Sequence, residues 1–356
     1  MLILLSCAER VTQSAKSTRR AQPPNIILLI GDGMGHSQLS ATYFYKTGEP
    51  HFSRFPVVGM SMTSSAKEKI TDSAAGATAI ATGQKTYNGA ISVDLSGDSL
   101  PTLMEMLSGE GYLTGAIATS SITHATPACF YAHSDSRKKE EDIALDLLHS
   151  QLSYFAGGGK KFFDERADGQ NLIASLIEKG FAINQENTTS SKQGYLLAPE
   201  GLPSKLEGRD TFLPDYTTKA LRFFQDAERP FFLLVEGSQI DWGGHANDGD
   251  YIVQEMLDFD LAIGRALDFA EQEGNTLVIV TADHETGGFT LASEEYTKDN
   301  IVQRNYSKLR YGFSTGGHSS AHVPVLAYGP GAERFTGIYE NTALFTKMKC
   351  AVLSCP

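Results

Sequence analysis

Residues 25–35 read NIILLIGDGMG, an uninterrupted apolar run that ends in glycines around a single aspartate. A continuous run of this kind predicts a strand buried on both faces, as in a parallel sheet that helices cover on each side. Glycine permits the tight turn and close backbone approach expected where the chain leaves such a strand. The stretch therefore predicts an α/β fold with polar residues grouped at strand ends.

Other apolar runs repeat this pattern along the chain. With the first run, the expected strands are Asn25–Ile30, Leu113–Thr119, Pro230–Val235, Thr276–Thr281 and Val323–Tyr328. Helical patterns separate them, which favours a three-layer α/β/α fold with a large, mostly parallel central sheet. Four of the five runs carry ionisable residues at or just after their ends. Because ligands of open α/β sheets bind outside the carboxyl ends of the strands, we expect the site there.

Length and charge narrow the class of protein. The chain has 356 residues, of which 41% are hydrophobic, so a substantial core is expected. The formal net charge of −12 argues against a broad basic surface for nucleic acid. No clear linker follows residue 24, which favours one domain over residues 25–356. Residues 156–214 show a weaker alternation of strand and helix patterns. They are expected to form an excursion from the main fold with few catalytic residues.

The first residues, MLILLSC, resemble the lipobox of bacterial lipoproteins and end at Cys7. They lack a basic segment and are shorter than a full signal, so the start of the chain falls inside a longer signal in this interpretation. Export, with a lipid on Cys7 and residues 8–24 as a flexible tether, is the expectation; a disordered N-terminus is the alternative. No other segment stays apolar over the ~20 residues of a membrane span.

Four cysteines are too few and too scattered for a disulfide framework. Cys129 is expected to pack as a small buried hydrophobe. The sequence leaves open whether Cys350 and Cys355 pair, because spacing alone does not establish disulfide geometry.

The segment after residues 230–235 carries three groups that can bind metals. Glu236, Asp241 and His245 lie within EGSQIDWGGH. Asp241 and His245 are four residues apart and meet on one face if they begin a helix. A carboxylate with an imidazole is a combination that suits zinc.

Three further candidates follow later in the chain. Asp283 and His284 end the apolar run that starts at residue 276, and His318 follows two glycines. One histidine alone is more often structural than a ligand. Several histidines beside carboxylates at strand ends indicate a metal site. Asp32 belongs with them by position, although an aspartate between glycines is also a common turn cap.

Ser73 lies in TDSAAGATA, where small helix-forming residues follow the serine. We expect it to begin a helix, whose N-terminal amides and dipole favour a phosphate; the alternative is that Asp72 or Ser73 is only an N-cap. No Gly-x-Ser-x-Gly elbow surrounds Ser73 and no histidine is close in sequence, so a metal is the expected activator. Arg137 offers a fork that pairs with phosphate oxygens, although alone it reads as a surface charge.

Taken together and in order, GDGMG, TDSAAGATA, THATPA, EGSQIDWGGH, TADHETGG and GGHSSAHVPVLAYGPGA resemble the bacterial alkaline phosphatases. The resemblance runs from about residue 25 to the C-terminus, and the length is similar to that of compact members. It implies a homodimeric phosphomonoesterase with two zinc ions and a third metal, usually magnesium, per subunit. Small phosphomonoesters are its implied substrates, hydrolysed through a phosphoserine intermediate on Ser73.

The resemblance also implies a role for each matching residue. The first zinc would be held by Asp241, His245 and His318. The second would be held by Asp32, Ser73, Asp283 and His284. The third metal would be held by Asp32, Thr126 and Glu236, and Arg137 would bind the phosphate.

Two positions depart from the family pattern. His124 and Trp242 stand where some relatives place aspartate and lysine. Both would lie near the third metal and the phosphate, so they bear on metal preference and phosphate affinity. The segment between Gly288 and Gly317 is also short, where larger relatives carry an interface-forming insertion.

Three rival readings are open at this stage. Phosphodiesterases resemble this site but often use a threonine nucleophile. Sulfatases need Cys or Ser in a C/S-x-P-x-R context, whereas Ser73 is followed by Ala-Ala-Gly. An inactive metal- or phosphate-binding surface lipoprotein is the third. A p-nitrophenyl phosphate assay with and without chelator separates them.

Overall fold

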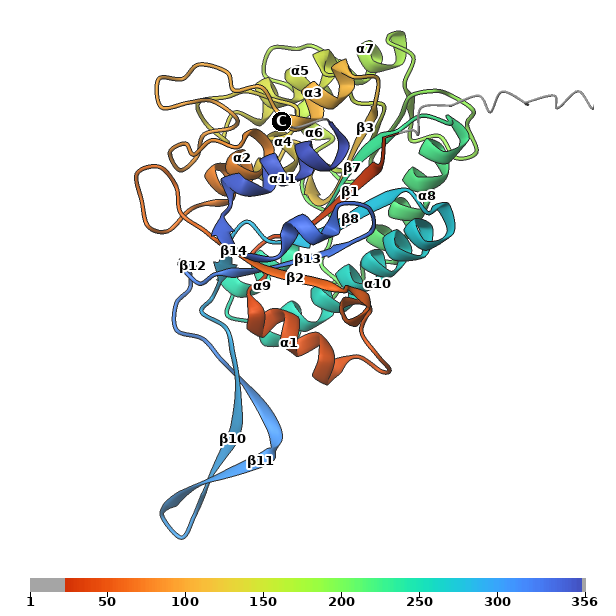
Figure 1. The fold of residues 1–356 in the computed structure, drawn as a ribbon. Coiled ribbons are helices and arrows are strands. Elements are labelled where there is room, and N and C mark those ends of the chain that lie inside the picture. The colour runs from red at the N-terminus through yellow and green to blue at the C-terminus, as the bar shows by residue number, and fades with distance from the viewer. Residues whose placement is uncertain (1–22, 354–356) are drawn as a thin grey trace, which may run out of the picture.

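A computed structural model describes residues 23–353 of the chain. Within this range the chain forms three layers, with one large sheet between two layers of helices (Figure 1). The expectation of an α/β/α fold around a mostly parallel sheet is therefore confirmed. Cys7, most of the proposed tether and Cys355 lie outside the described residues.

The central sheet has ten strands, of which only β13 runs antiparallel to its neighbours. In spatial order the strands are β14 (Gly337–Glu340), β2 (Val57–Met62), β13 (Val323–Tyr328), β8 (Thr276–Thr281), β1 (Asn25–Gly31), β7 (Phe231–Gly237), β3 (Leu113–Ser121), β4 (Tyr154–Gly158), β6 (Gln193–Leu196) and β5 (Ala182–Ile183). All five strands expected from the sequence are present, and β8 and β13 have the expected bounds.

Strand β1 lies at the centre of the sheet and is buried along its whole length. Its register places Ile30 opposite Glu236 of β7 on one side and opposite Thr281 of β8 on the other. Because the three strands are parallel, the segments that follow them leave the sheet at the same edge. Residues more than 200 positions apart in sequence therefore meet at the carboxyl ends of β1, β7 and β8.

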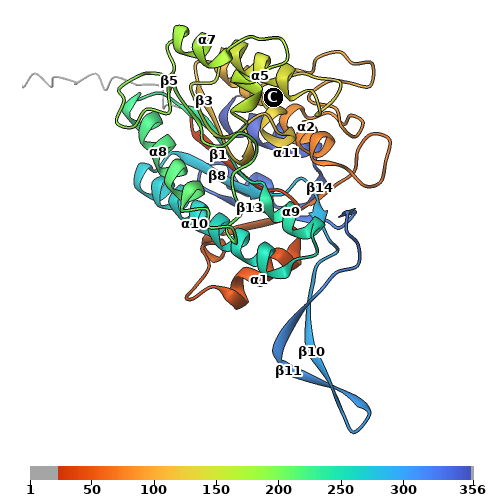
Figure 2. The same cartoon turned by 180° about the vertical axis from the view of Figure 1, so that it is seen from behind.

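Helices cover both faces, and each face has its own apolar core. One layer contains α2 (Ser73–Thr82), α3 (Leu103–Gly109), α4 (Ala125–Ala128), α5 (Glu140–His149), α6 (Lys161–Asp164), α7 (Leu172–Glu178) and α11 (Thr342–Val352). The other contains α1 (His36–Tyr45), α8 (Phe212–Asp226), α9 (Gln239–His245) and α10 (Gly249–Glu273). Figure 2 shows α8 and α10 side by side on this second face.

Short 3₁₀ turns, η1 (His51–Arg54) and η2 (Ala332–Phe335), complete the helical structure between residues 23 and 353. No helix in that range combines the length and the apolar character needed to cross a membrane.

The expectation for residues 156–214 is corrected by the structure. This part of the chain supplies β6, β5 and most of β4, which extend the central sheet beyond β3. The strands are short, with four residues in β6 and two in β5, so they produce no long apolar run in the sequence. The same region also supplies Glu200 and Gly201, which lie beside Trp242 at the edge of the site.

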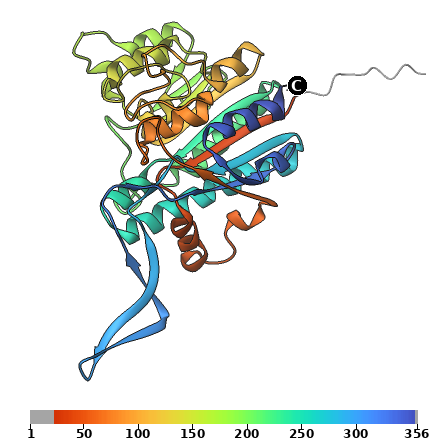
Figure 3. The same cartoon turned by 60° about the vertical axis from the view of Figure 1, so that its left-hand side comes forward.

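A long hairpin projects from the body of the molecule, formed by β10 (Thr290–Lys298) and β11 (Ile301–Gly312) (Figure 3). It occupies the segment between Gly288 and Gly317. At its base, the two-residue strands β9 (Glu285–Thr286) and β12 (His318–Ser319) pair with each other. This pairing brings His318 next to the residues that follow β8.

Cys129 is fully buried, as expected for a small packed side chain. Its thiol donates to the carbonyl oxygen of Ala74 in α2 at 3.2 Å. Burial raises the pKa of this thiol to about 12, so it stays protonated.

Candidate metal and phosphate site

Ser73 is the first residue of α2, which confirms that the serine begins a helix. The Asp72 side chain caps the helix by accepting from the amide of Ala75 at 3.0 Å. A Cβ added at Gly76 would lie only 3.1 Å from the carbonyl oxygen of Asp283, so the small residues of α2 let it approach the end of β8. The hydroxyl of Ser73 therefore lies at a helix N-terminus against the residues after β8.

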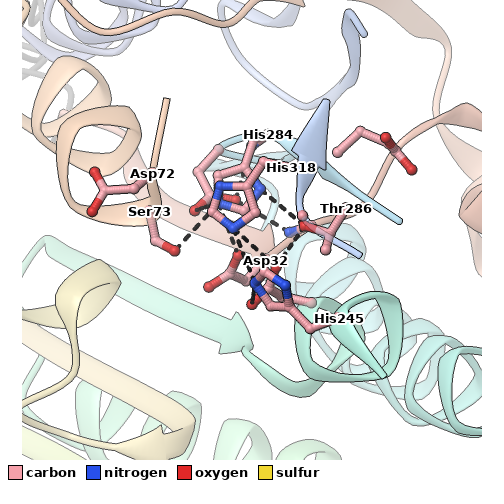
Figure 4. Close-up of polar contacts among 12 residues, drawn as sticks. Asp32, Asp72, Ser73, His245, His284, Thr286 and His318 are labelled. Carbon is pink, nitrogen blue, oxygen red and sulfur yellow. Dashed lines mark hydrogen bonds and ion pairs between the residues drawn. The ribbon is translucent and has the colours of Figure 1, made fainter. Parts of the chain in front are cut away.

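Asp32, Asp283 and His284 form one group beside this hydroxyl. Figure 4 shows Asp32 and His284 on the side toward which the Ser73 hydroxyl points. His284 Nε2 lies 3.2 Å from Ser73 Oγ, 3.4 Å from Asp283 Oδ2 and 3.5 Å from Asp32 Oδ1. Both carboxylates and the imidazole are fully buried. One ligand atom from each of the three residues lies within 4.8 Å of the others, a spacing that one metal ion can bridge.

Asp241, His245 and His318 form the neighbouring group. Asp241 and His245 lie one helical turn apart in α9, with His245 Nε2 3.4 Å from Asp241 Oδ2, as the sequence predicted. His318 Nε2 is 3.5 Å from Asp241 Oδ1 and 3.2 Å from His245 Nε2. In Figure 4 the two imidazoles point at each other across a shared space.

The hydrogen bonds of these two histidines indicate what belongs in that space. His245 Nδ1 lies 2.8 Å from the carbonyl oxygen of Gly316, and His318 Nδ1 lies 2.8 Å from that of Thr71. A carbonyl only accepts, so in both rings the proton is on Nδ1 and a neutral ring presents a lone pair at Nε2. Two lone pairs facing each other at 3.2 Å repel unless a cation lies near them. The arrangement fits a zinc site with carbonyls orienting its histidines.

A third group consists of Asp32, His124 and Glu236, which also offer ligand atoms within 4.8 Å of one another. His124 is the N-cap of α4, and its Nδ1 is buried without a hydrogen-bond partner among the described residues. Thr126, two residues later, is fully buried and lies beside Glu236. The structure thus brings His124 itself within reach of a metal, in addition to Thr126.

Several buried oxygens of this site lack partners within residues 23–353. They are both carboxylate oxygens of Asp32, Oε1 of Glu236 and Oδ2 of Asp283. A buried polar atom without a partner is costly, and a buried charge costs more. Bound cations would satisfy these oxygens, so the donor set fits the metals that the sequence implies.

The pKa values of the buried carboxyl groups Asp32, Glu236 and Asp283 are all raised. Burial, together with repulsion from Asp283, Asp241 and Glu236, raises the pKa of Asp32 well above its ordinary value. Burial raises the pKa of Glu236 to about 7, and the nearby hydroxyls of Ser238 and Thr126 only partly offset this. The protein alone therefore does not hold all these groups ionised, and nearby cations would.

Arg137 lies at the rim of the site rather than as a free surface charge. Its Nη1 donates to Asp72 Oδ2 at 3.1 Å, and its Nη2 lies 3.2 Å from His124 Nε2. Asp72 precedes Ser73, so the guanidinium stands next to the serine. Burial lowers the pKa of His124 to about 3, and the charge of Arg137 adds to the effect, so this imidazole is neutral.

Sequence reasoning missed the second role of Asp72 and any role for Thr286. Thr286 Oγ1 donates to Asp241 Oδ1 at 2.5 Å and lies 3.2 Å from His284 Nδ1, so it links the two histidine-containing groups. In the sequence, only its position two residues after His284 could have indicated that Thr286 belongs to the site. The pairing of Asp72 with Arg137 joins residues 65 positions apart, which no local pattern reveals.

Comparison with known proteins shows the family of this chain. Residues 24–309 match the family profile described as alkaline phosphatase. The chain is 33% identical to alkaline phosphatase 3 of Bacillus subtilis, over 95% of this chain and 91% of that protein. The chain belongs to the alkaline phosphatase family. It is therefore a phosphatase, an enzyme that hydrolyses phosphate monoesters.

Solved alkaline phosphatases share the fold closely. The enzyme from the Antarctic bacterium TAB5 is 47% identical, with a TM-score of 0.90 over 93% of this chain and 98% of that one. A variant of that enzyme with glutamate in place of a histidine has been solved with magnesium bound in its M3 site, and its TM-score is 0.91. The curated Escherichia coli K12 alkaline phosphatase is 32% identical over 92% of this chain and 86% of its own length.

Proposed function

We propose that this alkaline phosphatase hydrolyses small phosphate monoesters through a phosphoserine intermediate on Ser73, with two zinc ions and one magnesium ion per subunit. The observation that carries the proposal is the meeting of three ligand groups, one of which contacts the Ser73 hydroxyl through His284. Asp32 belongs to two of these groups, and His284 joins two of them, because it also offers a ligand atom within 4.8 Å of those of Asp241 and His318. A nucleophile at a helix N-terminus beside such a cluster suits phosphoryl transfer.

Each proposed ion has an assigned set of residues. Asp241, His245 and His318 would hold the first zinc, while Asp32, Ser73, Asp283 and His284 would hold the second. Asp32, Thr126 and Glu236 would hold magnesium, with His124 within reach of the same ion. When bound, these ions would make the serine hydroxyl more acidic and neutralise charge on the entering and leaving oxygens.

The residues of the chain supply the remaining steps. Arg137 pairs with two phosphate oxygens, and the first amides of α2 face the same group. Ser73 Oγ forms a bond to phosphorus as the ester bond breaks and the alcohol leaves. Water then attacks the phosphoserine, releasing inorganic phosphate and restoring the hydroxyl. Because these contacts concern the phosphoryl group, the reaction accepts many alcohols.

Rapid-quench measurements with a radiolabelled substrate test the covalent route. An acid-stable phosphoserine in the wild type, absent in Ser73→Ala, supports it, and its absence from the wild type would contradict it. Ser73→Ala should lower turnover by orders of magnitude while metal content, measured by atomic emission, stays nearly intact. Equal loss of metal would assign Ser73 a mainly structural role.

The contact between Ser73 Oγ and His284 Nε2 raises a second mechanism, in which the histidine acts as a general base without metals. Burial lowers the pKa of His284 to about 3, which makes it a weak base. Chelation distinguishes the two mechanisms. Loss of p-nitrophenyl phosphate hydrolysis with chelator, restored by zinc and magnesium, supports the metal route, whereas retained activity supports the histidine route.

We further propose that the protein is a homodimer. The β10–β11 hairpin carries exposed Ile301, Val302 and Tyr306 well away from the core. Exposed apolar groups of this kind favour association, and a second copy of the chain is the partner expected in this family. Light scattering at micromolar concentration should give twice the chain mass. Ile301→Asp with Val302→Asp should lower it toward one chain, whereas a monomeric wild type would overturn the proposal.

We also propose that the protein is exported and anchored through Cys7. Expressed with its complete signal, the wild type should partition into detergent and Cys7→Ser should be soluble. A soluble, unmodified wild type would refute the anchor.

A further inference from the structure

Beside the metal and phosphate site lies an open hollow of about 280 Å³ that the mechanism above does not use. Two aromatic side chains, Trp242 and Phe162, line it, and charged groups of Lys161 and Glu200 stand at its walls. Its volume is close to the lower end for small-molecule pockets, which leaves room for one flat ring system. The hollow therefore has the size and lining of a small aromatic subsite.

The hollow adjoins the reacting groups on two sides. Trp242 directly follows Asp241 in α9, so the helix that carries two ligands of the first group also carries one wall. His124 forms another part of the lining, and its Nε2 lies 3.2 Å from Arg137 Nη2. A substrate whose phosphate pairs with Arg137 therefore lies one side chain, that of His124, away from this space.

The Trp242 wall is fixed in place by the loop that follows β6. The six-membered ring of its indole packs on Gly201, where a Cβ would lie 2.6 Å from Cη2. The loop is held in turn because the Glu200 carbonyl accepts from the amide of Gly159 at 2.7 Å. Gly158 leaves no room for a Cβ against the same carbonyl. The hollow is therefore formed before any ligand arrives.

Another part of the lining combines an aromatic ring with a cation. Lys161 Nζ lies 5.0 Å from the centre of the Phe162 ring and forms an ion pair with Glu200. Glu140 also lines the hollow, but its carboxylate already accepts from Ser121 and Thr123 at 2.6 and 2.7 Å. Aromatic faces with polar groups at the rim suit a flat ligand that carries polar atoms on its edge.

We propose that this hollow binds the aromatic part of the alcohol leaving group, and that it favours a nucleobase separated from the phosphate by a ribose. The proposal rests on the phosphatase function above and adds a substrate class to it. Trp242 and Phe162 supply stacking surfaces, and Lys161 and Glu200 offer a donor and an acceptor to the edge of the base.

Matched substrates test the proposal in the metal-loaded enzyme. Adenosine 5′-monophosphate and ribose 5-phosphate differ by the base, and phenyl phosphate places a ring directly on the ester oxygen. Phe162→Ala should lower the ratio of kcat/KM for the nucleotide to that for ribose 5-phosphate about tenfold, and Phe162→Tyr should preserve it. Leu197→Ala, an exposed truncation outside the hollow, is the control and should leave the ratio unchanged.

If Phe162→Ala lowers kcat/KM more for phenyl phosphate than for the nucleotide, the preference for a nucleobase is wrong and the hollow binds an aryl ring bonded directly to the ester oxygen. The subsite would be overturned if Phe162→Ala changed neither the ratio of kcat/KM for the nucleotide to that for ribose 5-phosphate nor the ratio for phenyl phosphate to that for ribose 5-phosphate. If the wild type does not hydrolyse ribose 5-phosphate at all, the proposed phosphatase function itself is contradicted. This outcome differs from an unchanged ratio, which contradicts only the subsite.

Fluorescence provides a readout that needs no catalysis. Trp242 is the only tryptophan of the chain, so its emission reports on the hollow directly. Titration with adenosine, which has no phosphate, should quench this emission in the wild type, and Phe162→Ala should weaken the apparent affinity about tenfold. Ribose should have no effect. Equal titration curves in the wild type and Phe162→Ala would overturn the proposal.

Discussion

Two clusters of buried carboxylates in this molecule have opposite surroundings. Near α10, Glu255 and Asp258 both accept from Arg209 Nη2, at 2.5 and 3.0 Å, and the amide of Lys205 bonds the other oxygen of Glu255. At the carboxyl ends of β1, β7 and β8, the carboxylates of Asp32, Glu236 and Asp283 instead form no ion pair with an arginine or lysine of the described chain, and each has at least one oxygen without a hydrogen-bond partner there. Both clusters are almost completely buried.

The difference is that cations of the chain balance the carboxylates near α10, whereas the carboxylates at the strand ends have no such cation beside them within residues 23–353. Arg209 forms ion pairs with both carboxylates, and Lys205 Nζ lies 3.5 Å from Asp258 Oδ1, so cations of the chain balance this cluster and it holds the loop before α8 against α10. The carboxylates at the strand ends repel one another until something positive joins them. An unsatisfied buried charge is thus a better indicator of a binding site than burial or charge alone.

The largest expected effect comes from Asp32→Asn, since Asp32 belongs to two ligand groups. Its activity should fall by at least about 100-fold, because even residues that only orient metal ligands account for 10- to 100-fold. In metal-free protein the same change removes a carboxyl group whose ionisation burial and the neighbouring carboxylates disfavour, so the melting temperature at neutral pH should rise. Zinc content, turnover and calorimetry give the three readouts. A lower melting temperature in the metal-free variant would show that Asp32 is satisfied by the chain.

Arg209→Met should have the opposite effects: it should lower stability and leave the metal content unchanged. It leaves Glu255 and Asp258 buried without their cation, so the free energy of unfolding should fall by about 3–5 kcal/mol, with metal content retained. Urea unfolding measures the loss. Arg304→Met breaks an exposed pair with Glu295 and is the matched control, expected to change the free energy of unfolding by less than about 1 kcal/mol. A similar small change for Arg209→Met would mean that its cluster contributes little.

The melting temperature of metal-free protein should also depend on pH, with a smaller effect than the two substitutions above. The folded-state pKa of Glu236 is about 7, against 4.5 for an ordinary glutamate, so the folded state binds a proton that the unfolded chain has lost. Stability from this group is complete below about pH 4.5 and is lost as the pH rises through about 7. The melting temperature of chelated protein should therefore fall over this range, and Glu236→Gln should flatten the decline. An equal decline in that variant would assign the effect to other groups.

His124→Asp and Trp242→Lys should give the smallest changes. A carboxylate is a better ligand than imidazole for a hard ion, so His124→Asp should tighten magnesium binding about tenfold. Trp242→Lys adds a cation near the phosphate and should lower the inhibition constant for inorganic phosphate. Magnesium titration after mild chelation and product-inhibition kinetics measure the two effects. Unchanged values would place both side chains outside the metal and phosphate shells.

Local patterns predicted the parts of this protein that depend on neighbouring residues. The strands around the site are continuous apolar runs, and Asp241 with His245 follows from helical spacing alone. Contacts between distant segments left no such trace: Asp72 with Arg137, and Thr286 with Asp241, depend on how the sheet assembles. Strands β5 and β6 were missed because two and four residues are too few to show a period.

The order of strands in the sheet also constrains how the chain folds. Strand β1 leaves the ribosome early, yet its two neighbours, β7 and β8, are synthesised much later; Asn25 bonds a side chain 251 residues further along the chain. Strand β2 must likewise wait for β13 and β14. Such long loops must close before their contacts stabilise anything, which slows folding and leaves apolar strands uncovered. The nascent protein therefore carries the continuous apolar segment NIILLI without its neighbouring strands through most of its synthesis.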